Sequence, residues 1–435
     1  MTADEWTNWA GTEQCRPLRA RAPRDIGDVR AAIDEARAAG ITVRAVGSGH
    51  SFTGAALAPG LSLGLGRMAG LGHVDVDSGV VRVWAGTTLR ELSMLLDQHG
   101  LALPDLGDVD TQTISGAIAT GTHGTGARLG GLATAVAAVE MVAASGEVVT
   151  CARDEDPELL EAVAVSLGTL GIVTRVTLQC VPAFALRAVE RQEVWDELVA
   201  GIQESADTHD HFEFHWFPHT DRALVKRNDR LPPGTELDPV PGWRRLFDDE
   251  LLSNVVYEGV NRVSAWRPGW VPRINQISAR ALGAREYVDV SHRVFVSPRR
   301  VRFTECEYAV PREAVADVLT ELRGWIDRHD VSLPFPVEVR FAARDRLWLS
   351  TAYERDVAYV AVHQYHRMPA AEYFGAFEEI AAEVGGRPHW GKLHSLGATR
   401  LRDLYPRFDE FLALRDKLDP DRLFANPYTT RVFGP

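Results

Sequence analysis

The sequence predicts an α+β protein of two domains, followed by a C-terminal segment that returns to the first domain. Helix and strand signals alternate up to about residue 182, and short strands with alternating polar and apolar residues predominate after it, as in an antiparallel sheet. The length of 435 residues also exceeds what one core normally holds. We expect domains at residues 1–182 and 183–380, with residues 381–435 as the returning segment.

The first domain is predicted to begin with a helix and a buried strand. The stretch "IGDVRAAIDEARAAG" (26–40) places apolar residues at helical spacing and ends in glycine, and "ITVRAVG" (41–47) is typical of a buried strand. Residues 73–86 predict two short strands around a Ser-Gly turn. Thr88 is a candidate N-cap for the helix that follows, which we expect to stop at Gly100.

The second domain is predicted to hold a largely antiparallel sheet with helices packed on it. The residues 312–330 form the clearest helix, and the Pro-, Gly- and Asp-rich segment 227–243 is most simply a surface loop. Four segments alternate polar and apolar residues as strands do: "HFEFHWFPH" (211–219), "VRFTECEYAV" (301–310), "VEVRFAA" (337–343) and "AYVAVHQYH" (358–366).

The charge balance excludes some classes of partner. Sixty acidic residues against 47 basic ones give a formal charge of −13, and the basic residues are scattered along the chain. Nucleic acid is therefore not expected as a partner, because neutralising phosphates needs a localised basic surface. The same balance disfavours binding to an anionic membrane, so we expect no membrane partner.

The chain offers no targeting or disulfide signal. Its first residues, "MTADEWTNWAGTEQ", lack the features of a secretory leader, and no run of roughly 20 apolar residues is present. We therefore expect a cytoplasmic location. Because the cysteines lie far apart without a C-x-x-C pair, we expect reduced thiols rather than zinc or disulfides at Cys15, Cys151, Cys180 and Cys306.

A glycine-rich turn, "GSGHSFTG" (47–54), follows the predicted strand. It fails as a dinucleotide fingerprint, since Phe52 stands where the third glycine belongs and no ribose-binding acid is correctly placed. One interpretation is a tight turn with a packed histidine. The other is a nest of backbone N–H groups that cradles a phosphate, formed by Gly47, Ser48, Gly49, His50 and Ser51.

Two further segments add small residues to this first turn. The loop "ATGTHGTG" (119–126) contains Thr120, Thr122 and His123 beside a predicted strand. The segment "SLGTLGIVTRVTL" (166–178) leads through two glycines into another strand. Glycine at this density indicates close backbone approach, and two such loops suit a ligand with a pyrophosphate and a flat ring.

The second domain supplies candidate polar groups. Glu338 and Arg340 are two apart on a predicted strand and so project to one face, where they form either a surface ion pair or part of a site. His363 lies on a neighbouring strand, and Lys392 in "RPHWGK" is otherwise a solvated residue. A zinc set is conceivable among His209, His211, His215 and His219, but an amphipathic strand explains their spacing, and we expect no metal.

Five ordered segments together resemble one protein family. They are "RAVGSGHSFTG", "GDVDTQTISGAIATGTHGTG", "SLGTLGIVTRVTL", "EVRFAARD" and "RPHWGK". From about residue 6 to the C-terminus the chain resembles the sugar-oxidising branch of the vanillyl-alcohol oxidase superfamily. The nearest group is the aldonolactone oxidases and dehydrogenases, with alditol oxidases next. The resemblance implies a PCMH-type FAD-binding domain followed by a cap domain with a large antiparallel sheet.

The resemblance implies FAD as cofactor, bonded through its C8α methyl to the ring of His50. A neutral imidazole nitrogen is a competent nucleophile toward that methyl, and the link prevents loss of the cofactor. The other positions at which the resemblance implies contact with FAD are Gly47, Ser48, Gly49, Ser51, Gly107, Ser115, Gly116, Thr120, Thr122, His123, Gly124, Gly171 and Ile172.

The resemblance also implies an active site beside the flavin. Glu338 would bind sugar hydroxyls, and Arg340 would stabilise negative charge on the flavin. Either Lys392 or His363 would accept the hydroxyl proton. Asp108 corresponds to a substrate-contacting position; it and His363 replace the serine and threonine of alditol oxidases, which favours a lactone.

The expected activity is oxidation of an aldono-1,4-lactone (L-gulono-, L-galactono- or D-arabinono-1,4-lactone) by hydride transfer to flavin N5. Dioxygen, giving H2O2, or another acceptor would reoxidise the flavin, and Gly107 is compatible with oxygen access. Two alternatives use the same fold: an alditol oxidase acting on xylitol or sorbitol, and a tailoring oxidase for another sugar-like alcohol. A more remote alternative is a noncatalytic flavin- or sugar-binding protein.

Overall fold

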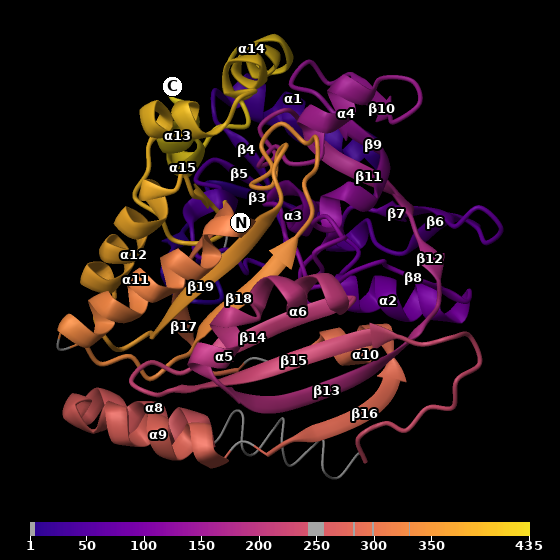
Figure 1. The fold of residues 1–435 in the computed structure, drawn as a ribbon. Helices are drawn as coiled ribbons and strands as arrows, with labels where there is room; N and C mark the ends of the chain where they lie inside the picture. The colour runs from indigo at the N-terminus through magenta and orange to yellow at the C-terminus, as the bar shows by residue number, and fades with distance from the viewer. Residues whose placement is uncertain (1–4, 242–255, 282, 298–299, 330) are drawn as a thin grey trace.

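The computed structural model describes residues 5–241, 256–281, 283–297, 300–329 and 331–435. The N-terminal elements and the last helices lie together, and a large twisted sheet lies beside them (Figure 1). None of the described helices is long and apolar enough to cross a bilayer. The four cysteines form no disulfide, and Cys151, Cys180 and Cys306 are buried.

Two sheets build the N-terminal part. A parallel sheet has the order β3 (Arg19–Arg21), β5 (Leu61–Gly64), β4 (Val43–Val46). An antiparallel sheet has the order β10 (Val148–Ala152), β9 (Val136–Val142), β11 (Ile172–Gln179), β7 (Val80–Trp84), β6 (Leu71–Asp75). The short pairs are β1 (Trp6–Thr7) with β2 (Gln14–Cys15), and β8 (Leu101–Ala102) with β12 (Val181–Pro182).

The helices of this part begin and end as the sequence predicts. The side chain of Asp25 accepts the N–H of Asp28 to cap α1 (Ile26–Ala39), which ends at Gly40 in the left-handed region. Thr88 caps α2 (Leu89–Gln98) in the same way, and Gly100 follows its end with φ 70°. Buried leucines on one face of α2 pack into the core, so local caps and helical periodicity suffice to define both helices.

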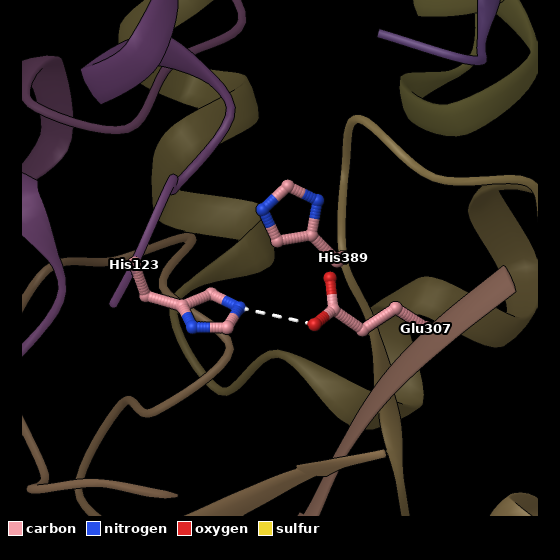
Figure 2. Close-up of side chains that lie close together, drawn as sticks. All are labelled: His123, Glu307 and His389. Carbon is pink, nitrogen blue, oxygen red and sulfur yellow. Dashed lines mark ion pairs between the residues drawn. The ribbon is translucent and has the colours of Figure 1, made fainter. Parts of the chain in front are cut away.

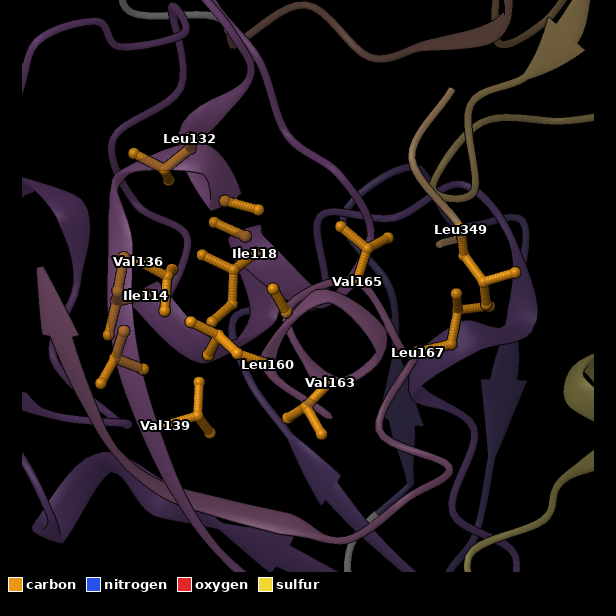
Figure 3. Close-up of a cluster of buried hydrophobic side chains, with 14 of the residues drawn as sticks. Ile114, Ile118, Leu132, Val136, Val139, Leu160, Val163, Val165, Leu167 and Leu349 are labelled. Atoms are coloured by element: carbon orange, nitrogen blue, oxygen red, sulfur yellow. The ribbon is translucent and has the colours of Figure 1, made fainter. Parts of the chain in front are cut away.

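The core of this part holds the glycine-rich segments in place. Helices α3 (Ile114–Ala119) and α4 (Pro157–Val163) pack on β9, and Figure 3 shows Ile118, Val139 and Leu160 among the side chains between them. Leu349, from the second domain, reaches the same cluster. The chain therefore has one shared core where the two parts meet.

An eight-stranded antiparallel sheet forms the second part. Its order is β16 (Arg285–Val290), β13 (Ala185–Val194), β15 (Arg222–Arg230), β14 (His211–Trp216), β18 (Val337–Ala342), β19 (Val357–Tyr365), β17 (Phe303–Pro311), β20 (Arg387–Pro388). The four strands predicted from alternation are therefore confirmed. The predicted loop 227–243 is wrong for its first residues, because β15 runs to Arg230, and residues 242–243 lie outside the described residues.

Helices cover one face of this sheet and leave the other toward the N-terminal part. Apolar side chains of α11 (Val315–Arg328) and α12 (Ala371–Glu383), with α5 (Trp195–Ala200) and α6 (Ile202–Thr208), pack on Phe212, Phe214 and Trp216. The opposite face carries the polar residues of the same strands. Helices α8 (Tyr257–Trp266) and α9 (Val271–Ala281) lie at one end of the sheet (Figure 1). Helix α10 (Ser291–Phe295) packs over the opposite face, where Phe295 contacts His211.

The C-terminal helices return to the N-terminal part. Side chains of α13 (Ala398–Leu404), α14 (Phe408–Leu418) and α15 (Pro427–Phe433) join the core cluster around α3 and α4. The strand β20 still belongs to the large sheet, so the chain leaves that sheet after residue 388 rather than at 381. The first strand of the large sheet, β13, begins at Ala185, close to the expected boundary after residue 182.

Candidate active site

A cavity lies between the glycine-rich segments of the N-terminal part. It is partly open to solvent and is lined largely by glycine, serine, alanine and other small residues. The segment from Arg44 to Ser51 lines one wall, and residues of α3 and of the stretch 163–173 line the others. The predicted cofactor residues that it brings together are Gly47, Ser48, Gly49, His50, Ser51, Ser115, Gly116, Thr120 and Gly171.

In the first glycine-rich turn, Gly47 and Gly49 stand at positions that do not accommodate a larger residue. A Cβ on Gly47 would lie 2.6 Å from the hydroxyl oxygen of Thr113, and Gly49 has φ 69°. The hydroxyl of Ser48 donates to the carbonyl of Thr111, which ties the turn to the next loop. The backbone of this turn is therefore held directly against the cavity.

His50 is a neutral imidazole in this wall. Its Nε2 lies 2.6 Å from the hydroxyl oxygen of Thr111, and its ring stacks on Trp9 with the centroids 5.9 Å apart. Burial, with the nearby Lys392 ammonium, lowers the pKa of His50. A neutral ring keeps a lone pair on one nitrogen, and Thr111 already contacts Nε2.

The remaining predicted cofactor residues do not line this cavity. The hydroxyl of Thr122 contacts Gln112, which does line it, and Ile172 is buried in the core. The N–H of Gly124 donates to a buried carboxylate oxygen of Asp105, and a Cβ there would lie 2.3 Å from that carboxylate. A Cβ on Gly107 would lie 3.0 Å from the carbonyl oxygen of residue 123.

The predicted pair Glu338 and Arg340 shares the polar face of β18. The Arg340 guanidinium lies 2.5 Å from the Glu338 carboxylate and 2.9 Å from that of Glu213 on β14, and it also contacts Asp108. Glu213 in turn lies 3.1 Å from the ammonium of Lys226. One buried cation therefore gathers three carboxylates, two of them predicted from the sequence and Glu213 not.

The charge of Arg340 persists despite burial. Burial lowers the pKa of Arg340 to about 10, which still leaves it protonated at neutral pH. Asp105 lies behind it, and burial raises the pKa of that carboxyl to about 7, although the backbone N–H of Leu106 opposes the shift. The planar guanidinium of Arg340 donates its N–H groups in fixed directions, and the three carboxylates around it therefore hold it in one orientation.

His363 and Lys392 meet at a carboxylate that the sequence analysis did not identify. Glu305 on β17 lies 2.5 Å from the Lys392 ammonium and 3.5 Å from Nε2 of His363. The Nδ1 of His363 lies 2.9 Å from the carbonyl oxygen of Pro336, to which an N–H at Nδ1 would donate. Nε2 therefore faces the carboxylates of Glu305 and, at 4.0 Å, Glu338.

Glu307, two residues after Glu305 on β17, is a second buried carboxylate on the same face of the sheet. We call the polar side chains on this face, Glu213, Glu305, Glu307, Glu338, Arg340 and His363, the polar row. Figure 2 shows that Glu307, His123 and His389 converge; Nε2 of His123 lies 3.2 Å from the Glu307 carboxylate. Burial opposes charge on His123, but Glu307 outweighs it and raises the pKa of the ring; His389 is held neutral by burial, its pKa lowered to about 4. Lys392 lies 3.9 Å from Glu307, so both carboxylates share one ammonium.

Glu305 and Glu307 could have been found from the sequence. They alternate with Cys306 and Tyr308 in a strand whose other face is apolar, so the spacing predicts two acids on one buried face. Buried acids are rare unless they are paired. The pairing itself, with Lys392 and His123, follows only from the sheet order.

The described residues contain two groups of ligands spaced closely enough for a metal ion, His123–Glu307–His389 and Asp108–Glu213–Glu338. Each group already has a cationic side chain beside it, Lys392 or Arg340, which would repel a metal. The histidines suggested as an alternative zinc set separate: β14 begins at His211, and His209 contacts Asp229 instead. We assign no metal to these groups.

The cavity and the polar row adjoin through the "RPHWGK" segment. The N–H of Phe52 donates to the carbonyl of Gly391 at 2.7 Å, and the hydroxyl of Thr53 donates to that of Trp390. The Lys392 ammonium lies 5.3 Å from the ring centre of Phe52, two residues from His50. The turn that carries His50 and the strand face that carries Glu305 are therefore parts of one site.

The cavity lies next to the oriented guanidinium of Arg340 and the imidazole of His363. Residues 17–152 match a family model described as an FAD binding domain, so the class of protein is an FAD-dependent oxidoreductase. Residues 176–432 match the model of D-arabinono-1,4-lactone oxidase. The chain belongs to this family, which confirms the superfamily and the group expected from the five segments.

Known proteins are similar over the full length. An L-gulono-1,4-lactone dehydrogenase of Mycobacterium tuberculosis is 41% identical, with 99% of each chain covered. An L-gulonolactone oxidase of Bos taurus is 34% identical, covering 99% of this chain and 98% of the other. The solved cholesterol oxidase of Brevibacterium sterolicum has a TM-score of 0.83 at 18% identity, covering 99% and 96% of the two chains, and shows that the fold is shared.

Proposed function

We propose that this protein oxidises an aldono-1,4-lactone, such as L-gulono-1,4-lactone, to its 2-keto form. The names of its relatives support this substrate class. The observation that carries the proposal is the buried array around Arg340, in which Asp108 and Glu338 offer acceptors for sugar hydroxyls beside the cation. The departures at Asp108 and His363 from the alditol oxidase pattern favour a lactone over a linear polyol.

The cavity fits FAD on its own geometry. The turn around Gly47 and Gly49 offers backbone N–H groups where a side chain would be excluded, as a pyrophosphate requires. His50 would hold the cofactor covalently, and because Thr111 contacts Nε2, we assign the bond to Nδ1.

FAD, when bound, supplies the hydride acceptor for the carbon that carries the reacting hydroxyl. His363 accepts the hydroxyl proton at Nε2, and its Nδ1–H stays on the carbonyl of Pro336. The carboxylate of Glu305 then stabilises the imidazolium that forms. Nζ of Lys392 is paired with Glu305 at 2.5 Å, so we assign Lys392 the role of positioning that carboxylate rather than that of the base.

The substrate and the acceptor are tested together with the purified yellow protein. Under anaerobic conditions, L-gulono-, L-galactono- or D-arabinono-1,4-lactone is expected to bleach the 450 nm band, while xylitol and sorbitol leave it unchanged. Bleaching by the polyols alone would contradict the lactone assignment. On admission of air, a rapid return of the band would support O2 as acceptor, which Gly107 permits, and a slow return would indicate another acceptor.

The covalent link has its own test. After acid precipitation, the yellow colour is expected to stay with the pellet of the unaltered protein and to appear in the supernatant of His50→Ala. The matched control is His73→Ala, an exposed histidine on β6. Colour in the supernatant of the unaltered protein would refute the bond at His50 without touching the lactone proposal.

A further inference from the structure

The helices α8 and α9 bury small polar side chains and expose large apolar ones. In α8 the fully buried side chains are Asn261 and Ser264, which are small and polar, while Val263 and Trp266 face outward. In α9 Val271 is buried at the first position, and the other buried residues are Asn275 and Ala279. An ordinary surface helix buries its large apolar side chains, so this pattern needs a partner for the outer face.

Exposed apolar side chains gather here. Trp266 is 70% exposed, Trp270 53% and Ile277 68%, and half of the exposed large apolar residues in the described chain lie within residues 256–277. Single exposed apolar residues are ordinary, but two neighbouring tryptophans at the bend between two helices are not. We call Val263, Trp266, Trp270, Ile277 and the arginines beside them the α8–α9 face.

The α8–α9 face is also cationic. Arg262 pairs with Glu258 at 2.8 Å, whereas Arg267, Arg273 and Arg280 form no ion pair with any described residue. Glu258 is the only acid between residues 256 and 281. The whole-chain charge of −13 does not cancel this patch, because salt screens charges beyond about 10 Å.

The face is held in a fixed orientation at the outer end of the molecule. The side-chain amide of Asn275 donates to the carbonyls of Pro218, at 3.0 Å, and Leu333, at 2.8 Å, which anchors α9 to the cap domain. Figure 1 shows α8 and α9 at the end of the molecule away from α1 and α4. Tyr257 and Ala265 of α8 pack against the cluster that contains Phe52 and Phe335, whereas Trp266 and Trp270 are exposed.

We propose that the α8–α9 face binds peripherally to an anionic lipid bilayer. Tryptophan rings favour the headgroup level, and arginines bury their stems while their guanidinium groups contact lipid phosphates. Arg267 lies between the two tryptophans in the sequence and over the ring of Trp266, an arrangement that inserts into a fluid surface without needing a complementary protein shape. This departs from the expectation of no membrane partner, which rested on the charge of the whole chain, and it is independent of the substrate proposed above.

Vesicle sedimentation of the FAD-loaded protein tests the proposal. Vesicles of phosphatidylglycerol and phosphatidylcholine are expected to carry the protein into the pellet, and vesicles of phosphatidylcholine alone to bind it about tenfold less. The double variant Trp266→Ser, Trp270→Ser is expected to bind anionic vesicles at least about tenfold less while keeping its lactone turnover. The matched control replaces Leu18 and Met94, which are equally exposed elsewhere, by serine and is expected to bind as the unaltered protein does.

Other results would overturn the proposal. Equal binding by the unaltered protein and the tryptophan variant would remove the α8–α9 face from it. A protein that ignores anionic vesicles but forms a dimer in gel filtration, lost in the same variant, would make the face a contact between copies instead. If the tryptophan variant fails to fold, Arg267→Ser with Arg273→Ser replaces it, with weaker binding expected to the anionic vesicles only.

Discussion

Replacing Arg340 by alanine is expected to slow flavin reduction by the lactone about 10²- to 10³-fold while the cofactor stays bound. Arg340 is the cation that Asp108, Glu213 and Glu338 share. Its loss removes the positive charge that would stabilise negative charge on the flavin, and it leaves three buried carboxylates repelling one another. The measurement is stopped-flow bleaching of the 450 nm band under anaerobic conditions. Retained absorbance at 450 nm in the resting variant shows that FAD is in place.

The controls for this prediction separate charge from folding. Because unpaired buried charges cost about 3–5 kcal/mol, the alanine variant is also expected to unfold at lower denaturant concentration. Arg340→Lys keeps the charge but not the fork, and an intermediate rate is expected for it. Arg344→Ala changes an exposed arginine just beyond β18 and should leave the rate unchanged. Near-normal reduction in Arg340→Ala would take Arg340 out of the mechanism.

Replacing His363 by glutamine is expected to slow flavin reduction about 10²- to 10⁴-fold and to flatten the acid limb of the pH profile of kcat/KM. The reason is that Nε2 of His363 is the nitrogen placed to accept the hydroxyl proton. Glu305→Gln, which removes the carboxylate 3.5 Å from Nε2 of His363, should also slow flavin reduction. The measurement is kcat/KM for the lactone from pH 5 to pH 9.

Lys392 provides the decisive comparison for the identity of the base. Lys392→Met should lower the rate and keep the acid limb, because the ammonium only supplies charge beside Glu305. If the limb disappears in Lys392→Met and survives in His363→Gln, the lysine is the base. Glu379→Gln is the matched control for Glu305→Gln, because it also removes one negative charge. Glu379 is an exposed residue of α12, so this change should leave the rate and the pH profile unchanged.

Much of the local structure could be predicted because it depends on neighbours in the sequence. Thr88 identifies a helix start and Gly40 a helix end, and the spacing of Glu338 and Arg340 places both on one face of a strand. The glycines around His50 identify a tight turn, which lines the cavity. These predictions needed no knowledge of which strands pair.

The parts that failed or were missed depend on segments far apart. The end of β15 at Arg230 follows from its ladder with β13, which overrides the polar composition of that stretch. The contacts of His123 with Glu307 and of Gly124 with Asp105 join segments that are far apart in the sequence. Composition alone does not fix such contacts.

The sequence by itself determined the family, the helix caps, the glycine-rich turns and the face that Glu338 and Arg340 share. Only the tertiary structure decided that Glu213, Glu305 and Glu307 complete the polar row and that arginines and tryptophans gather on the α8–α9 face. The physical reason is that β14 lies beside β18 and β17 beside β19, although these strands are distant in the chain. Coulomb interactions depend on separation in space, so the partners of Arg340, His363 and Lys392 are set by strand order and register.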